Sequence, residues 1–223
     1  MSAPNHDCEQ LLADIRAEAH ETRHATGRDA FAERVLDALR DVPREEFVTD
    51  ALRHQAYANH PLPIGRGQTI SQPFIVALMT DLIDPRPHHT VLEIGAGSGY
   101  QAAVLARLVS KVYTLEILDE LAQDAARRLQ RLGYANVEVA TGNGWLGWPE
   151  HAPYDAILVA AAAVHVPEAL VTQLKPGGRM VVPVGLPHEV QDLVLVTRDE
   201  DGRVARRSVL PVAFVPLVAP MLA

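Results

Sequence analysis

The sequence predicts an α/β fold with a doubly wound, mostly parallel sheet, an N-terminal helical extension and a C-terminal antiparallel hairpin. Three observations support this prediction. Apolar residues recur at helical spacing in two stretches that open the chain. From about residue 90, short apolar runs alternate with helical stretches, which is typical of parallel β-α-β units. The last apolar runs have no long helical stretch between them, which favours antiparallel pairing at the C-terminal end.

The individual elements follow from these patterns. The expected strands are Val91–Ile94, Val112–Leu115, Val137–Ala140, Ala156–Ala160, Arg179–Pro183 and Leu193–Thr197, with a last extended run near Val212–Val215. The expected helices between them are Tyr100–Leu108, Leu118–Leu132 and Pro167–Leu174.

The first part of the chain is expected to be helical. Leu11, Leu12, Ile15 and Ala19 mark one amphipathic helix. A second is marked by Phe31, Val35, Leu36 and Leu39, with Asp29 as the expected N-cap and Pro43 ending it. From Asn59 to Pro73, prolines and glycines indicate a long loop, a feature that is often functional. Pro73 then suits the first turn of a further helix.

Composition narrows the function. The 223 residues are 48% hydrophobic and 22% charged, with a formal net charge of −8, so no nucleic-acid partner is expected. Cys8 is the single cysteine, which leaves no intramolecular disulfide and makes the cytoplasm the expected compartment. Neither a signal peptide nor an apolar run long enough for a membrane span is expected. The ten histidines lack ligand spacing, so no metal is expected.

The strongest local motif is the stretch Val91–Tyr100, in which a buried strand runs into Gly95, Gly97 and Gly99 before a helix. Glycines in such a turn let a ligand approach the backbone at the carboxyl end of a strand. A dinucleotide fingerprint would need glycine where Tyr100 stands, and the lysine of a phosphate-binding loop is absent. The spacing instead resembles the first motif of class I S-adenosylmethionine methyltransferases, although such a loop can also be a plain strand-to-helix turn.

Two further strand ends carry polar residues. Glu116 ends the second strand, where a carboxylate can accept both ribose hydroxyls of a nucleoside. A solvent-exposed acid at a strand end is the alternative. Gly142, Asn143 and Gly144 follow the third strand, where asparagine can pair with the amino edge of adenine. Taken alone, this segment is best interpreted as an ordinary Asn-Gly turn. Together with the glycine loop and Glu116, however, it makes three successive strand ends with residues suited to a nucleoside, which favours a cofactor site.

Beyond these motifs, about four fifths of the chain resembles one family, protein-L-isoaspartate O-methyltransferase, a class I methyltransferase with a Rossmann-like fold. The matching stretches are Val42–Val48, Leu62–Gly65, Gly67–Pro73, Val91–Leu105, Gly144–Asp155, Gln173–Gly178, Val182–Gly185, Gln191 and Phe214–Leu217. The segment Gln-Thr-Ile-Ser-Gln-Pro at 68–73 discriminates, because generic methyltransferases lack it.

The resemblance implies roles for individual residues. Ser71 is the implied active-site serine, and the implied contacts to the cofactor are Glu93, Gly95, Ala96, Gly97, Ser98, Gly99, Glu116, Gly142, Asn143 and Gly144. The implied substrate contacts are Thr69, Ile70, Ser71, Gln72, Val182, Pro183 and Val184. At position 143 the family usually has aspartate. The asparagine is therefore expected to weaken cofactor binding by about 1 kcal/mol without abolishing it.

The resemblance also implies the reaction. The expected enzyme is a protein-L-isoaspartate(D-aspartate) O-methyltransferase that uses S-adenosyl-L-methionine, releases S-adenosyl-L-homocysteine and methylates isoaspartyl-containing proteins and peptides for repair. It is expected to be a monomer, with an N-terminal helical segment 1–58 packed on a methyltransferase domain 59–223 whose substrate loop spans 59–73. Arg66 in that loop is expected to be available for acidic groups of the peptide. The open alternatives are a paralogue that methylates a different peptide aspartate and a non-catalytic protein that binds S-adenosylmethionine. A nicotinamide-dependent dehydrogenase is a third, less favoured alternative.

Overall fold

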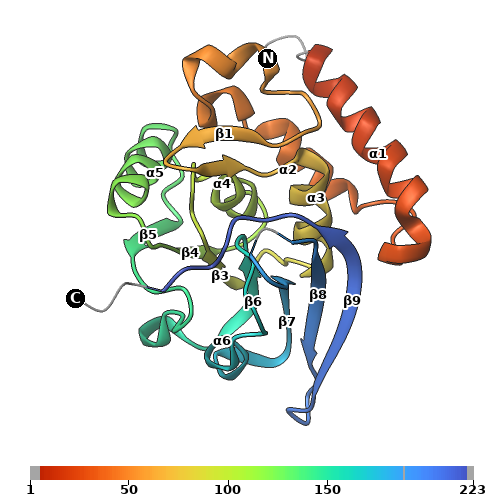
Figure 1. Ribbon diagram of the computed structural model, residues 1–223, viewed down its shortest axis with the longest axis vertical. Helices are drawn as coiled ribbons and strands as arrows, with labels where there is room; N and C mark the ends of the chain where they lie inside the picture. The colour runs from red at the N-terminus through yellow and green to blue at the C-terminus, as the bar shows by residue number, and fades with distance from the viewer. Residues whose placement is uncertain (1–5, 188, 220–223) are drawn as a thin grey trace.

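A seven-stranded sheet forms the centre of the protein in the computed structural model, which describes residues 6–187 and 189–219 (Figure 1). The strands lie in the order β5-β4-β3-β6-β7-β8-β9. Their bounds are β3 (Thr90–Ile94), β4 (Lys111–Glu116), β5 (Val137–Thr141), β6 (Tyr154–Val159), β7 (Leu174–Val184), β8 (Gln191–Arg198) and β9 (Val204–Val212). β3 to β7 pair in parallel, whereas β8 and β9 are antiparallel. The predicted fold class is confirmed.

Helices and loops cover both faces of the sheet, which is why its central strands are apolar on both sides. The helices are α1 (His6–Thr26), α2 (Glu33–Asp41), α3 (Pro73–Leu82), α4 (Tyr100–Ala106), α5 (Asp119–Arg131) and α6 (Glu168–Thr172). Short 3-10 segments are η1 (Arg44–Phe47), η2 (Asp50–Gln55) and η3 (Pro149–His151). Along β3, Val91 belongs to the core under α1 to α4, and Leu92 belongs to the core under α6.

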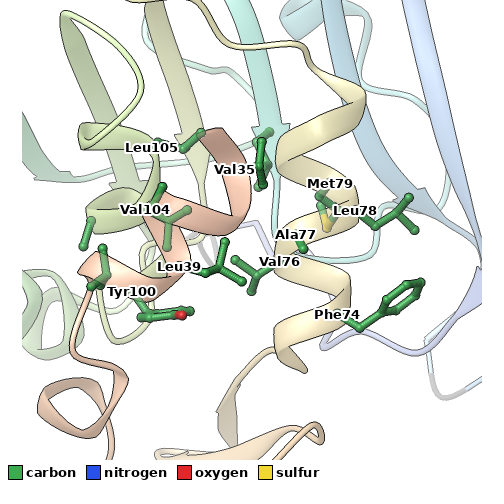
Figure 2. Packing of buried hydrophobic residues seen from close by; sticks show 14 of the residues in the cluster. Val35, Leu39, Phe74, Val76, Ala77, Leu78, Met79, Tyr100, Val104 and Leu105 are labelled. Carbon is green, nitrogen blue, oxygen red and sulfur yellow. The ribbon is translucent and has the colours of Figure 1, made fainter. Parts of the chain in front are cut away.

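The N-terminal helices share a core with the helices that flank the sheet. Figure 2 shows α2 side chains, among them Val35 and Leu39, packed between those of α3 and α4. Val76 and Val104 lie in the same cluster and are fully or almost fully buried. α1 in turn packs along α3 and beside β9 (Figure 1). Residues before 59 therefore contribute to one continuous hydrophobic interior.

The expectation that Asp29 caps the second helix is wrong. α2 begins at Glu33, and its N-cap position is occupied by Ala32, whose side chain makes no capping bond. The backbone N–H of Ala32 instead donates to the Asp81 carboxylate at 2.9 Å. Asp29 pairs with His20 of α1 at 2.8 Å. A carboxylate from α3 thus supplies a hydrogen bond that the local sequence lacks.

Two other expectations change. The loop between Asn59 and Pro73 contains a hairpin of β1 (Leu62–Gly65) and β2 (Gln68–Ile70). The last strand is not near Val212–Val215 but is β9, which ends at Val212. β9 is an edge strand whose first five residues are all exposed, so no apolar run marks it in the sequence. Among the described residues, no helix has the length and apolar character needed to cross a membrane.

Candidate active site

A cleft of about 950 Å³, open to solvent, lies at the carboxyl ends of the central strands. The ends of β3 and β4 form its floor together with the glycine loop between β3 and α4. The β1–β2 hairpin and the C-terminal segment 215–218 form further walls. This is the edge of a parallel sheet at which ligands bind in open α/β folds.

The glycine loop is shaped by residues with positive φ. Gly95, Gly97 and Gly99 have φ values of 93°, 52° and 86°, a region that side chains with a Cβ rarely adopt. The N–H of Gly95 donates to the carbonyl of Leu115 at 2.7 Å, which ties the loop to the end of β4. A Cβ on Gly97 would lie 3.4 Å from Ile64 Cδ1 of the hairpin. The loop is therefore closely packed between the sheet and β1–β2.

Glu116 lies at the end of β4 and is not a solvent-exposed acid, because only 6% of its surface is exposed. One carboxylate oxygen accepts the N–H of Gly97 at 2.9 Å, and the other accepts the N–H of Leu118 at 3.1 Å. An ionised carboxylate offers about four acceptor sites. Glu116 thus fixes the glycine loop and keeps acceptor capacity toward the cleft that it lines.

Glu93 is a fully buried carboxylate that lines the same cleft. No hydrogen bond of standard geometry joins either oxygen to another described residue, although the Thr114 hydroxyl lies near enough to lower the pKa of this carboxyl in part. Burial raises the pKa of Glu93 to about 8, and the nearby charge of Glu116 adds to that rise. An acid that forms no ion pair at this depth favours a cationic or hydrogen-bond-donating ligand.

The turn after β5 approaches the cleft through its backbone. Gly142 and Gly144 line it, and a Cβ on Gly144 would lie 2.3 Å from Ile94 Cγ2. Asn143 is not among the lining residues. Its Oδ1 accepts the backbone N–H of Trp145 at 3.1 Å, as in an ordinary asparagine turn.

A second cavity adjoins the cleft. This groove, of about 1130 Å³, is lined mostly by apolar side chains of α3, β9 and the segment after it. Thr69, Ser71, Ala160 and Val215 line both the groove and the cleft. Of the remaining expected substrate contacts, Ile70 lines the cleft and Gln72 lines the groove. Ser71 therefore lies where the two cavities meet.

The other expected substrate contacts lie elsewhere. Val182, Pro183 and Val184 end β7 and line neither cavity. Val182 is fully buried in the core under α6, and the Pro183 carbonyl accepts the N–H of Ala163 at 2.9 Å. Their role as substrate contacts therefore stays a prediction. Among the described residues, no three His, Cys, Asp or Glu side chains are grouped as a metal site.

Arg44 is a residue that the sequence reasoning missed. Its guanidinium is fully buried, donates to the carbonyl of Ser71 at 2.8 Å and to that of Ala56 at 2.9 Å, and lies over the Tyr100 ring. Tyr100 begins α4 directly after Gly99, so Arg44 links the segment around Ser71 to the glycine loop. The only indication in the sequence was that Arg44 lies in the stretch Val42–Val48, which resembles the family. That resemblance did not indicate what Arg44 does.

The C-terminal segment also contributes to both cavities. Ala162 donates its N–H to the carbonyl of Val215 and accepts the N–H of Leu217, both at 2.8 Å. The Phe214 N–H donates to the buried side chain of Gln191 at 2.7 Å. These bonds hold residues 214–217 against the loop after β6 and the start of β8.

Comparison with known proteins decides the family. The model of the family "Protein-L-isoaspartate(D-aspartate) O-methyltransferase (PCMT)" matches residues 22–221. This chain belongs to that family. Protein-L-isoaspartate O-methyltransferase 2 of Polaromonas sp. strain JS666 is 58% identical over 207 residues, covering 93% of this chain and 98% of the relative. Protein-L-isoaspartate O-methyltransferase 1 of Cupriavidus necator is 57% identical, covering 93% and 80%.

Solved structures of the methyltransferase family have the same fold. A protein-L-isoaspartate O-methyltransferase structure superposes with a TM-score of 0.81 at 30% identity, covering 94% of this chain. The present chain spans 65% of that protein's chain. A Plasmodium falciparum protein described as a beta-aspartate methyltransferase, in complex with S-adenosyl-L-homocysteine, superposes with a TM-score of 0.77 at 23% identity, covering 97% and 99%.

Proposed function

We infer that this member of the family transfers a methyl group from S-adenosyl-L-methionine to the free carboxyl of L-isoaspartyl residues in damaged proteins and peptides. The observation that supports this function best is the meeting of two cavities at Ser71. The cleft with its buried acids suits the cationic methyl donor. The more apolar groove suits a peptide, and the shared wall is where an acceptor oxygen can face the methyl group.

The residues of the cleft fit the cofactor. S-adenosylmethionine, when bound, supplies an electrophilic methyl group on a positively charged sulfur. Glu93 offers a buried carboxylate that forms no ion pair with a described residue, which suits the positive charge of the methionine portion. Glu116 keeps acceptor sites for the ribose hydroxyls beside its two backbone bonds. The backbone of Gly142 and Gly144 lies open to the cleft for a flat base.

The reaction requires no base from the protein. An isoaspartyl carboxyl has an ordinary pKa near 4 and is already ionised at neutral pH. No histidine, lysine or cysteine stands among the described residues that line either cavity. The protein therefore acts by holding the carboxylate in line with the methyl group and by excluding water.

Ser71 is the proposed orienting residue. No hydrogen bond joins its hydroxyl to another described residue. The hydroxyl is thus free to donate to the substrate carboxylate. Its own carbonyl is held by the buried Arg44 at 2.8 Å, which fixes the backbone from which the hydroxyl projects. Thr69 and Gln72, on either side in the chain, are the proposed peptide contacts.

The function is tested with labelled S-adenosylmethionine and two peptides of the same sequence, one L-isoaspartyl and one L-aspartyl. Labelling of the isoaspartyl peptide alone is the expected result. Labelling of the aspartyl peptide would instead indicate a carboxyl methyltransferase with another substrate. Tight cofactor binding without labelling of either peptide would indicate a binding protein and contradict the proposal.

Three further properties belong to the proposal. We expect a monomer. We expect a cytoplasmic location, in keeping with a single cysteine, Cys8, which is buried in α1. We expect residues 59–223 to hold the cofactor and residues 1–58 to contribute mainly packing, apart from Arg44 and Glu18, which contact the segment around Ser71.

A further inference from the structure

The N-terminal helix α1 contributes one side chain to the peptide groove. Glu18 lies on this helix and is the only charged residue among the described residues that line the groove. The other walls are apolar or uncharged, including Ile75 of α3 and Leu210 of β9. Glu18 precedes residue 22, at which the family match begins. The charge of the groove is therefore set by a part of the chain outside the matched region.

Neutral amides hold the Glu18 carboxylate in place. The Gln72 Nε2 lies 3.1 Å and 3.3 Å from its two oxygens, and the Asn59 Nδ2 donates at 2.8 Å. Asn59 Oδ1 in turn accepts the N–H of Phe74 at 3.0 Å, which fixes the orientation of that amide. Because Gln72 directly follows Ser71, these bonds place Glu18 beside the proposed acceptor position.

Within residues 6–187 and 189–219, no positively charged side chain forms an ion pair with Glu18, although α1 carries other paired residues such as Arg16. Burial raises the pKa of Glu18 against the opposing effect of the two amides, and Glu21 adds to the rise. A half-buried carboxylate without a counter-ion is stabilised by a cation that enters the groove.

We propose that Glu18 is a specificity-determining residue that favours isoaspartyl peptides with a lysine or arginine next to the isoaspartyl residue and disfavours those with an acidic neighbour. This inference rests on the proposed function. Neighbouring residues of a peptide are about 3.8 Å apart along the backbone, and a lysine or arginine side chain is long enough to reach one residue further. A peptide whose isoaspartyl group faces Ser71 therefore brings such a neighbour to Glu18.

Other acids near the groove could produce a similar preference. Glu93 and Glu116 lie in the adjoining cleft, and the whole chain has a net charge of −8. Their effect is common to all variants at position 18 and survives its substitution. The contribution of Glu18 is thus separable by mutation, and it weakens with added salt because the groove is open to solvent.

The test uses isoaspartyl peptides that differ only in one flanking residue, lysine, alanine or glutamate, placed before or after the isoaspartyl residue. For the unmodified enzyme we expect kcat/KM to be about ten-fold higher for the lysine than for the glutamate peptide on one side, mostly through KM. Glu18→Gln lowers this ratio several-fold, to the residual preference that the other acids of the chain maintain. Glu18→Lys inverts it, and loss of folding alone cannot invert a ratio measured within one variant.

Asp14→Asn is the matched control, because Asp14 lies one turn earlier on α1, is exposed and does not line the groove. This variant keeps the preference of the unmodified enzyme. An unmodified enzyme without preference, or a preference that Glu18→Gln leaves unchanged, overturns the role of Glu18. The alanine peptide reports the proposed function separately, since failure to methylate any of the peptides overturns that function and this inference with it.

Discussion

The cofactor cleft and the peptide groove are built in different ways. The floor of the cleft consists of successive strand ends between β3 and the turn after β5, which lie close together in the sequence, while the β1–β2 hairpin and residues 215–218 add its outer walls. The groove is assembled from α1, the segment around Ser71 and the chain beyond β9. Short-range motifs therefore define the cleft, whereas long-range packing defines the groove.

Because of this difference, we expect the cleft to determine cofactor binding and the groove to determine which peptides are used. In the proposed function, residues of the cleft act on the cofactor through backbone groups and two buried acids, Glu93 and Glu116. Residues of the groove act through side chains that distant elements hold in place, such as Glu18 and Gln72. Changes in the cleft are expected to alter cofactor affinity, and changes in the groove are expected to alter the use of peptides. Arg44 connects the two regions.

The largest effect is expected for Glu116→Ala. The N–H groups of Gly97 and Leu118 lose their acceptor, and the proposed ribose contact is lost as well. Since each hydrogen bond to a charged group contributes about 1.5–3 kcal/mol, the Kd for S-adenosylmethionine should rise at least about 100-fold. Titration calorimetry measures this Kd. Glu120→Ala on the exposed start of α5 serves as the control, and an equal loss there would contradict the assignment.

Arg44→Lys is expected to have the next largest effect, because Arg44 connects the segment around Ser71 to the glycine loop of the cleft. Lysine keeps a positive charge but lacks the planar fork that contacts both the Ser71 and the Ala56 carbonyls. We expect kcat/KM for an isoaspartyl peptide to fall about 30-fold, which corresponds to about 2 kcal/mol. Thermal unfolding identifies variants that remain folded. Unchanged kcat/KM in such a variant would show that Arg44 does not position Ser71.

Glu93 predicts a pH dependence of cofactor binding. Its pKa of about 8 means that the carboxyl is mostly neutral at pH 7 in the free protein. A cationic ligand favours the ionised form, so binding releases a proton, and affinity should rise between pH 6 and 8 and level off above 8. The slope is at most about ten-fold per pH unit. In Glu93→Gln, the remaining change of affinity with pH comes from S-adenosylmethionine itself. Identical profiles of affinity against pH for this variant and the unmodified protein would show that Glu93 does not release a proton on binding.

The smallest effect is expected for Arg66→Ala. Arg66 lies in the β1–β2 turn and pairs with Glu120 of α5, and both side chains are more than half exposed. Exposed ion pairs contribute little, so the free energy of unfolding should change by less than about 0.5 kcal/mol. Chemical denaturation measures this change. A several-fold increase in KM for the isoaspartyl peptide would instead support the expectation that Arg66 contacts acidic groups of the substrate.

The sequence predicted the sheet because its parallel strands are continuous apolar runs, and it predicted the cleft because the glycine loop and Glu116 follow strands directly. It placed the last strand wrongly, since the exposed positions of the edge strand β9 conceal the pattern. The hairpin β1–β2 was hidden by prolines and glycines that suggested a loop.

The groove could be predicted only in part. Ser71 and Gln72 stood out through their family segment, but nothing local indicates that Glu18 or Arg44 reaches them. Glu18 and Gln72 are 54 positions apart, and Arg44 and Ser71 are 27 apart. Such contacts depend on how α1 and η1 pack, which is a property of the tertiary structure. The same limit applies to Val182–Val184, whose resemblance to the family did not reveal that they line neither cavity.

The central claim is that the cleft and the groove meet at Ser71, which acts on the acceptor side. The most direct test measures two quantities for Ser71→Ala: the Kd for S-adenosylmethionine and kcat/KM for an isoaspartyl peptide. We predict a Kd within about two-fold of the unmodified enzyme and a kcat/KM at least about ten-fold lower, as for loss of one hydrogen bond to a charged group. Unchanged methyl transfer, or a loss of cofactor affinity as large as the loss of kcat/KM, would contradict this account.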